Sequence, residues 1–227
     1  MDNASHSLFD ITLFGHVFGV SINLVIQWVI MLIITIVIII STRNLNKVPG
    51  KRQTVLEMFV SSINGVVKEI MGKEYLFFAP YIGALGLFLL LMNLTGLVGF
   101  EPPTVDYSVS LGMALTTFII IQAYAIKKNG LLHYFTAYGK PFVFLAPINV
   151  LERFLLPLSL SLRLFGNMMA GAAVMSLVYT SLNHIGWVAQ LGIPIPVHAY
   201  FDIFDGGIQM VVFTMLTMVN IKIISEH

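Results

Sequence analysis

The chain has 227 residues, of which 57% are hydrophobic and only 10% are charged, and its formal net charge at neutral pH is +1. Soluble domains carry roughly 25% charged residues, so a soluble protein of this composition could not cover its apolar surface. We therefore expect an all-α membrane protein that crosses the bilayer several times. The balanced charge gives no reason to expect a nucleic-acid partner. The absence of cysteine excludes disulfides and thiol chemistry.

The opening stretch, MDNASHSLFD, contains no lysine or arginine. It resembles neither a secretory signal nor a transit peptide, so we expect the first apolar segment to be retained. Apolar segments long enough to cross the roughly 30 Å hydrocarbon core then recur along the chain, and we expect one polytopic membrane domain over residues 1–227. The last two segments are long enough that they must tilt or bend. The expected spans cover about residues 21–40, 78–100, 109–125, 148–185 and 195–224.

Residues 52–72 have a different pattern, because their apolar residues repeat at helical spacing while the charges fall largely on the other side. We interpret this segment as an amphipathic helix on the membrane surface; the alternative is a short soluble helix in a loop. Its apolar positions are Val55, Met58, Phe59, Ile63, Val66, Val67 and Ile70.

The basic residues predict the orientation of the chain. Ten of the twelve fall between spans one and two, between spans three and four, or at the C-terminal end; the other two, Arg153 and Arg163, lie within the fourth span. We therefore expect the N-terminus outside the cell and the C-terminus in the cytoplasm. The ten are Arg43, Lys47, Lys51, Arg52, Lys68, Lys73, Lys127, Lys128, Lys140 and Lys222.

Arg163 stands about sixteen residues inside the fourth expected span. A charge at the bilayer centre costs about 2.5–3.5 kcal/mol on insertion scales, and a guanidinium group does not lose its proton. Helical spacing puts Glu152, Ser159 and Asn167 within about 40° of the line through Arg163. The fourth span therefore carries a polar stripe, and the charge itself is expected to be functional.

The fifth expected span has a matching stripe, which consists of His198, Asp202, Asp205, Gln209 and Asn220. Two antiparallel helices that each carry one polar stripe indicate a polar path through the membrane.

Simpler interpretations of the two stripes stay open. Arg163 could be a structural residue that pairs with Glu152. Asp202 and Asp205 could be interfacial carboxylates, and His198, which lies nearer the outer turn, is expected at the interface.

The sequence contains no G-x-x-x-x-G-K-[ST] phosphate-binding loop, nucleophile elbow, HExxH motif or Cys/His cluster. We therefore expect no catalysis by this chain alone, no direct nucleotide binding, no cofactor and no fixed metal site.

Three stretches of the sequence carry a specific resemblance: PINVLERFLLPLSLSLRLFGNMMAG, GGIQMVVFTMLTM and PTVDYSVSLGMALTTF. They closely resemble the subunit a family of F-type ATP synthases, the membrane stator beside the rotating c-ring, and the resemblance covers nearly the whole chain. It implies that Arg163 faces the c-ring. It further implies translocation roles for Asn167, one turn after Arg163, for Gln209, facing Arg163, for Glu152, near the cytoplasmic exit, and for Asn93, near the outer half-channel.

The sequence departs from the family pattern at two positions. Many relatives carry glutamate or histidine nine residues after the arginine, where this chain has Ala172, and histidine or glutamate seven residues before the glutamine, where it has Asp202. The outer half-channel is therefore expected to differ, with Asp202 as its main carboxylate and Asp205 in support.

The resemblance implies a mechanism and a set of partners. H⁺ or transiently bound Na⁺ enters by the outer half-channel, neutralises a c-ring carboxylate, travels with the ring, and is released into the inner half-channel beside Arg163, whose charge favours the ionised carboxylate. The implied partners are the c-ring, the peripheral-stalk subunit b, the other F0 and F1 subunits and the lipid of the cell membrane.

Two other functions remain as alternatives. A self-contained secondary transporter would show inverted repeats and broken helices near the midplane, and we find neither in the sequence. A structural scaffold with buried ion pairs would tolerate neutral substitutions at Arg163 and Asp202. The choice between H⁺ and Na⁺ is open, because it depends mainly on subunit c.

Overall fold

The computed structural model describes residues 7–13, 16–43, 46–47, 49–130, 146–183, 192 and 194–226. Five stretches of helix are long and apolar enough to cross a membrane, which confirms the predicted all-α architecture with five spans. The expected residues 184–185 at the end of the fourth span lie outside the described residues. The spans are Ile22–Thr42, Lys73–Val98, Tyr107–Asn129, Pro147–Asn183 and Pro194–Ser225.

The spans are built from α1 (Ile22–Thr42), α3 (Ala79–Asn93), α4 (Tyr107–Asn129), α6 (Ala146–Asn183) and α9 (Gly206–Glu226). Short helical turns extend some of them: the 3₁₀-helices η1 (Lys73–Phe78) and η2 (Leu94–Val98) flank α3, η3 (Pro103–Val105) precedes α4, and α8 (Pro194–His198) with the π-helix η5 (Ala199–Asp205) leads into α9. An antiparallel hairpin of β1 (Ser7–Leu13) and β2 (His16–Ser21) precedes α1. The sequence pattern did not predict this hairpin, which lies outside the spans.

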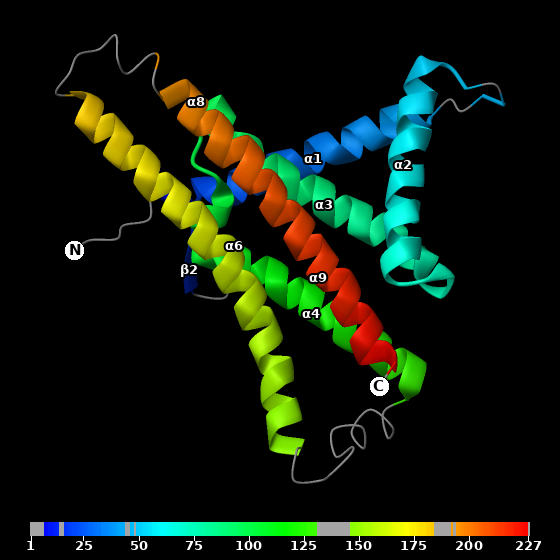
Figure 1. Ribbon diagram of the computed structural model, residues 1–227. Helices are drawn as coiled ribbons and strands as arrows, with labels where there is room; N and C mark the ends of the chain where they lie inside the picture. Colours follow the sequence, from blue (N-terminus) through cyan, green and yellow to red (C-terminus); the bar gives the residue numbers. More distant parts are fainter. Residues whose placement is uncertain are drawn as a thin grey trace.

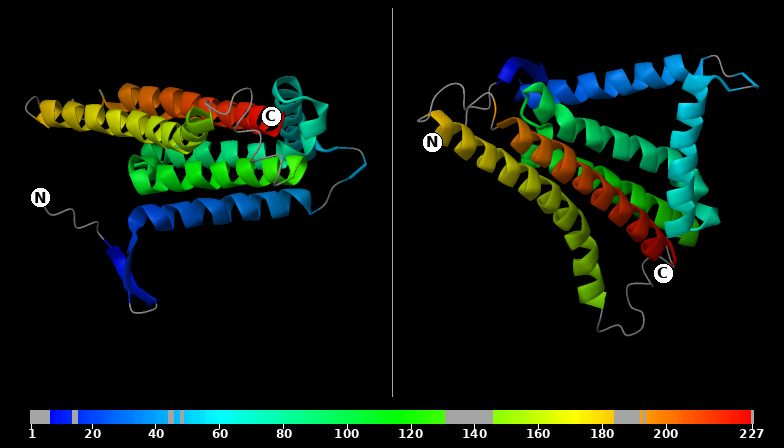
Figure 2. Two further views of the ribbon diagram at one scale, coloured as in Figure 1. Left: turned by 90° about the horizontal axis from the view of Figure 1, so that it is seen from below. Right: turned by 45° about the horizontal axis from the view of Figure 1, so that its top comes forward.

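The spanning helices form layers, as the left view of Figure 2 shows. Helices α6 and α9 lie on one side, α3 and α4 are in the middle, and α1 is on the far side. Helix α4 packs against both α6 and α9, whereas α1 contacts mainly α3 and the short η3 turn. Only 6% of the apolar window of α1 is buried, so most of this helix presents apolar side chains to its surroundings.

Helix α4 begins and ends beyond the predicted limits of 109 and 125, because both ends are stabilised. The Asp106 carboxylate accepts a hydrogen bond of 2.9 Å from the backbone N–H of Ser108, which makes Asp106 an N-cap. Lys127 and Lys128 lie in the last turn, where positive charge interacts favourably with the helix dipole. Polar residues thus extend the helix past its apolar segment.

Helix α6 contains 38 residues, which corresponds to about 57 Å of helix. The sequence predicted that this long segment tilts or bends, and α6 bends in its first half (Figure 1). Pro157 lies in this half, and a proline inside a helix removes a backbone hydrogen bond and bends the axis. The bend turns the N-terminal part of α6 away from the other spanning helices.

Helix α2 (Lys51–Ile70) corresponds to the predicted amphipathic segment. It runs across the ends of the spanning helices (Figure 1) and contacts α1, α3 and α9. Its apolar residues divide into two groups. Val67 is fully buried and Ile63 and Ile70 pack against the same cluster, whereas four others remain exposed: Val55, Met58, Phe59 and Val66.

Two apolar clusters hold the helices together. The larger lies at the α2 end and joins η1, α3, α4 and α9. There the Tyr75 hydroxyl lies 2.8 Å from the Ser225 hydroxyl and accepts a hydrogen bond of 2.8 Å from Lys128 Nζ, which attaches the last turn of α9 to α4. The second cluster fixes the part of α6 around Arg163 and consists of Leu89, Ala114, Leu160, Leu164 and Phe213.

Candidate functional site

Arg163 lies on the side of α6 that the other helices do not cover. Leu160 and Leu164 are 3% and 1% exposed and face the second apolar cluster, whereas Arg163 and the neighbouring Leu162 are exposed. Within the described residues, Arg163 has no hydrogen-bond or ion-pair partner. The arginine is therefore presented outward from a well-anchored helix.

Glu152 and Ser159 are exposed on α6 as well. Glu152 precedes Arg163 by eleven residues, which is about 16 Å along the helix axis. This separation is too large for a direct ion pair, so the structural pairing that the sequence left open is not present. Glu152 and Arg163 instead mark two separate positions along the same helix.

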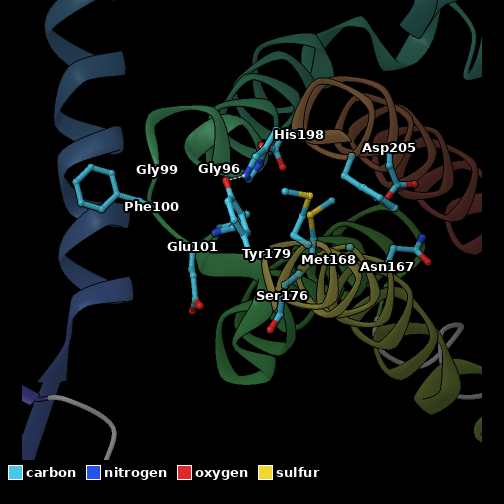
Figure 3. A pocket seen from close by; sticks show the side chains of 16 residues that line it. Gly96, Gly99, Phe100, Glu101, Asn167, Met168, Ser176, Tyr179, His198 and Asp205 are labelled. Atoms are coloured by element: carbon cyan, nitrogen blue, oxygen red, sulfur yellow. Dashed lines mark hydrogen bonds and ion pairs between the residues drawn. The ribbon is translucent and has the colours of Figure 1, made fainter. Parts of the chain in front are cut away.

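On the other side of Arg163, a cavity of about 310 Å³ begins at Asn167, the residue one turn further along α6. Figure 3 shows Asn167 and Asp205 toward one end of this cavity, and Glu101, Tyr179 and His198 toward the other. Helix α6, the loop after η2, and the α8–η5 segment supply its walls. Its polar lining residues are Glu101, Asn167, Ser176, Tyr179, His198, Asp202 and Asp205.

Asp202 is only 9% exposed, although it carries a carboxylate. Its Oδ2 atom lies 3.0 Å from His198 Nδ1, one turn earlier, and His198 Nε2 lies 3.2 Å from the hydroxyl of Tyr179 on α6. Asp202 belongs to the π-helix η5, and such wide turns occur often at functional sites. Asp202 and Asp205 both line the cavity, and their role in the outer half-channel stays a prediction.

The backbone of Gly96 forms the wall directly behind the Asp202 carboxylate. A Cβ atom at position 96 would lie 2.5 Å from Asp202 Oδ2 and 2.6 Å from its Cγ. Since non-bonded carbon and oxygen atoms do not approach this closely, only glycine fits here. The close approach shows that Gly96, in the middle of η2, leaves the space that the Asp202 carboxylate occupies.

We expect Gly96→Ala to lower ion-coupled ATP synthesis by about ten-fold or more, because small displacements of reacting groups have effects of this size. The added methyl group must displace the Asp202 carboxylate, which contacts His198. The measurement is the synthesis rate of the reconstituted complex under an imposed ion gradient. Gly112→Ala is the matched control, since a Cβ there meets nothing within 4 Å. Equal rates for the two variants would contradict the expectation.

Asn93 does not line the cavity but lies behind its wall. It is fully buried; its Nδ2 donates to the carbonyl oxygen of Gly206 at 3.0 Å, and its Oδ1 accepts from Thr104 Oγ1 at 3.1 Å. A Cβ on Gly206 would lie 2.9 Å from the Asn93 Cβ. Asn93 therefore attaches α3 to the start of α9, next to Asp205.

Gln209 is 6% exposed and lies on α9, one turn after Asp205, which ends η5. It does not line the cavity, and among the described residues no hydrogen bond joins it to Arg163. Asn220 is further along α9, far from the cavity in sequence and half-buried. The structure therefore brings together Asn167, Asp202 and Asp205, but neither Gln209 nor Glu152 joins them.

The sequence analysis expected His198 only as an interfacial member of the polar stripe and did not single out Tyr179, yet His198 contacts Asp202 and Tyr179 contacts His198. His198 and Asp202 are four residues apart, a spacing that makes a helical contact predictable. Tyr179 gave no such signal, since it comes from another helix. Ala172 lines the cavity as well, so the residue that replaces the usual polar group of the family pattern does face this space.

Together, the five apolar spans, the uncovered arginine and the neighbouring cavity with its ionisable side chains define an ion-translocating helical membrane protein. The sequence profile of the ATP synthase A chain family matches residues 24–222. The chain therefore belongs to the ATP synthase A chain family. It is a multi-pass membrane protein and the ion-translocating stator subunit of the F0 sector, and it works within the F0/F1 complex as a translocating rather than a catalytic subunit.

Individual relatives agree with this assignment over most of their length. The chain is 36% identical to ATP synthase subunit a of Moorella thermoacetica over 195 residues, covering 86% of each chain. It is 34% identical to the Listeria monocytogenes subunit over 233 residues, covering 96% of this chain and 97% of the relative. A third relative, from Propionigenium modestum, is named as sodium ion specific; it is 33% identical over 221 residues, covering 90% of this chain and 74% of the relative.

Proposed function

We propose that the cavity is the outer half-channel of the stator, that the surface around Glu152 belongs to the inner half-channel, and that Arg163 separates the two. One observation carries this proposal. The cavity begins one turn to one side of Arg163, at Asn167, and Glu152 lies about 16 Å along the helix to the other side. The two polar regions are therefore offset along α6 with the fixed charge between them.

The distribution of basic residues supports the orientation, with the N-terminus outside and the C-terminus in the cytoplasm. Lys51, Arg52 and Lys68 lie on α2, and Lys127 and Lys128 end α4; these elements gather at the same end of the molecule as the C-terminus (Figure 1). Basic residues favour the cytoplasmic side. The cavity lies toward the opposite end, beside α8, which suits a path that opens outward. Lys140 lies outside the described residues.

The open face of α6 is the surface that we assign to the c-ring. A ring carboxylate that arrives next to Arg163 meets a permanent positive charge in a region of low dielectric, which favours the ionised carboxylate and hence release of its ion. The same charge repels a cation that would pass directly between the half-channels. Each elementary charge that crosses 100 mV supplies about 2.3 kcal/mol, and rotation of the ring carries this energy to the catalytic subunits.

The remaining exposed surfaces fit the other proposed partners. Helix α1 exposes apolar side chains along most of its length, which suits lipid of the cell membrane and contact with subunit b. Helix α2 exposes Val55, Met58, Phe59 and Val66, which suits immersion in the cytoplasmic membrane surface. In this arrangement the chain acts as one polytopic membrane domain.

Cysteine labelling tests the two half-channels, since the native chain contains no cysteine. We expect Ser176→Cys, in the cavity wall, to react with a membrane-impermeant thiol reagent added from outside, and Glu152→Cys to react only from the cytoplasmic side. Ile33→Cys on α1 is the control and should stay unlabelled. Its apolar surroundings exclude the charged reagent and disfavour the ionised, reactive form of the thiol. The measurement is labelled protein in oriented vesicles. Labelling of Ser176→Cys from the cytoplasmic side only would contradict the proposal.

A further inference from the structure

The part of α6 that precedes Pro157, residues 147–156, forms an arm that leaves the bundle of spanning helices. Figure 1 and the right view of Figure 2 both show the arm turning away from the other spans. Among the described residues of the arm, only Leu156 packs against the two apolar clusters. Apolar packing therefore does little to fix the angle of the arm. Four of its apolar side chains are more than half exposed: Ile148, Leu151, Phe154 and Leu155.

Arg153 reaches from the arm back to α4. Its Nη1 atom donates a hydrogen bond of 3.2 Å to Oε1 of Gln122, and both side chains are half-buried. Lys127, a basic residue near the end of α4, is exposed instead, as expected for a side chain that keeps its charge in water. A guanidinium group stays protonated, and hydrogen bonds to charged groups are stronger than those between neutral groups. The pair therefore joins the arm directly to α4.

Arg153 and Glu152 point to different sides of the arm, because consecutive helical residues are about 100° apart. Regular helical spacing places Glu152 within about 20° of the line through Arg163 and Arg153 about 80° from it. Glu152 is exposed, whereas the hydrogen bond to Gln122 holds the guanidinium group on the α4 side. The second positive charge of α6 is thus kept off the face that carries Glu152 and Arg163.

The position of Glu152 is sensitive to the angle of the arm. Glu152 lies five residues before Pro157, which is about 7.5 Å along the helix axis. A change of about 10° at the bend would move Glu152 by about 1.3 Å. A displacement of about 1 Å can change the rate of a reaction by about a hundred-fold. Whatever holds the arm at its angle therefore matters for the function of Glu152.

We propose that Arg153 and Gln122 form a positioning pair, whose hydrogen bond sets the angle of the arm and so determines where Glu152 lies relative to Arg163. This inference rests on the proposed inner half-channel around Glu152. Neither residue of the pair binds the translocated ion, and Arg153 acts through Glu152. The pair extends the functional region of the chain from α6 to α4.

The test exchanges the two residues in the whole complex, reconstituted in liposomes. We expect Arg153→Gln to lower ion-coupled ATP synthesis by about ten-fold. The double variant that carries Arg153→Gln and Gln122→Arg should return to within about three-fold of the native rate, because it restores the same hydrogen bond in the opposite direction. A requirement for charge at position 153 alone would leave the double variant slow.

Two further variants break or keep the pair from the α4 side while Arg153 stays in place. Gln122→Leu removes the acceptor and should lower the rate as Arg153→Gln does. Gln122→Glu retains an acceptor and should keep most of the native rate. Phe154→Leu is the matched control, because Phe154 is an exposed apolar residue of the arm next to Arg153.

A distance measurement separates this role from a purely structural one. Spin labels on Leu151→Cys in the arm and Ala123→Cys in α4 report the angle of the arm, since both positions are exposed and the native chain contains no cysteine. We expect a shifted or broader distance distribution in Arg153→Gln and the native distribution in the double variant. The amount of assembled complex should be equal in all variants.

Native synthesis in Arg153→Gln would overturn the inference. So would native distances in a slow Arg153→Gln variant, or a double variant that stays as slow as Arg153→Gln. Cytoplasmic labelling of Glu152→Cys is the separate check of the half-channel. Its absence would overturn the proposed inner half-channel, while the distances would still decide whether the pair sets the angle of the arm.

Discussion

Replacement of Arg163 by alanine should abolish ion-coupled ATP synthesis while the complex still assembles. The side chain is exposed and unpaired within the described part of the chain, and the packing of α6 rests on its neighbours Leu160 and Leu164. Removal of the guanidinium group therefore removes a charge without creating a cavity in the core. Ring carboxylates would then keep their ions beside α6, and the barrier between the half-channels would be lost.

Two measurements check this expectation. The synthesis rate should fall by at least about a hundred-fold, the size of effect expected when a key electrostatic group is removed, and the passive ion leak through F0 should rise. Leu162→Ala is the control, because Leu162 is an exposed neighbour on the same helix. Normal coupled synthesis in Arg163→Ala would refute the assignment of this residue and favour the structural scaffold.

Asp202→Asn should reduce coupled synthesis almost as strongly, by about a hundred-fold. Asparagine has nearly the same shape as aspartate and can keep a contact with His198, so the fold around η5 is retained. The amide does not take up and release protons, however, and it replaces the most buried of the described ionisable side chains that line the cavity. The measurement is the synthesis rate at a fixed ion gradient, with the amount of assembled complex as the reference.

Asp205→Asn is the matched comparison for Asp202→Asn. Asp205 lines the same cavity but is less buried and has no hydrogen bond to His198 among the described residues. We therefore expect a smaller decrease, of about ten-fold or less. The opposite order of the two effects would mean that Asp205, rather than Asp202, is the main carboxylate of the half-channel.

Local sequence signals predicted the spans and the polar stripe of α6. Apolar length is enough to place a spanning helix, and regular α-helical spacing is enough to put Glu152, Ser159 and Arg163 on one exposed side. Helix ends were less predictable. The cap at Asp106 and the lysines at the end of α4 lengthen that helix, and such polar extensions do not appear in a search for apolar segments.

The fifth span was harder to predict because it is not a regular α-helix throughout. The π-helix η5 inserts a wider turn between His198 and Gln209. A stripe predicted with a constant rotation per residue therefore groups residues that lie apart in the structure. Asp202 lines the cavity, whereas Gln209 is buried further along α9 and does not line it.

Contacts between distant segments could not be inferred from the sequence. Tyr179 and His198 meet only because α6 and α8 lie side by side, and Gly96 approaches Asp202 across 106 positions of chain. The role of Asn93 as a link to Gly206 depends in the same way on how α3 packs against α9. No periodic pattern in the sequence predicts these tertiary contacts, since each contact depends on how whole helices pack.

The anchoring of α6 has a mechanical consequence. Leu160 and Leu164 lie on either side of Arg163 in sequence and are buried in the cluster that contains Ala114 of α4 and Phe213 of α9. In the proposed arrangement, the turning c-ring pushes sideways on α6. Close-packed apolar contacts yield little under load, so this push passes into α4 and α9 rather than bending α6 near the arginine. The stator can therefore resist torque at the position where the alignment of charges matters most.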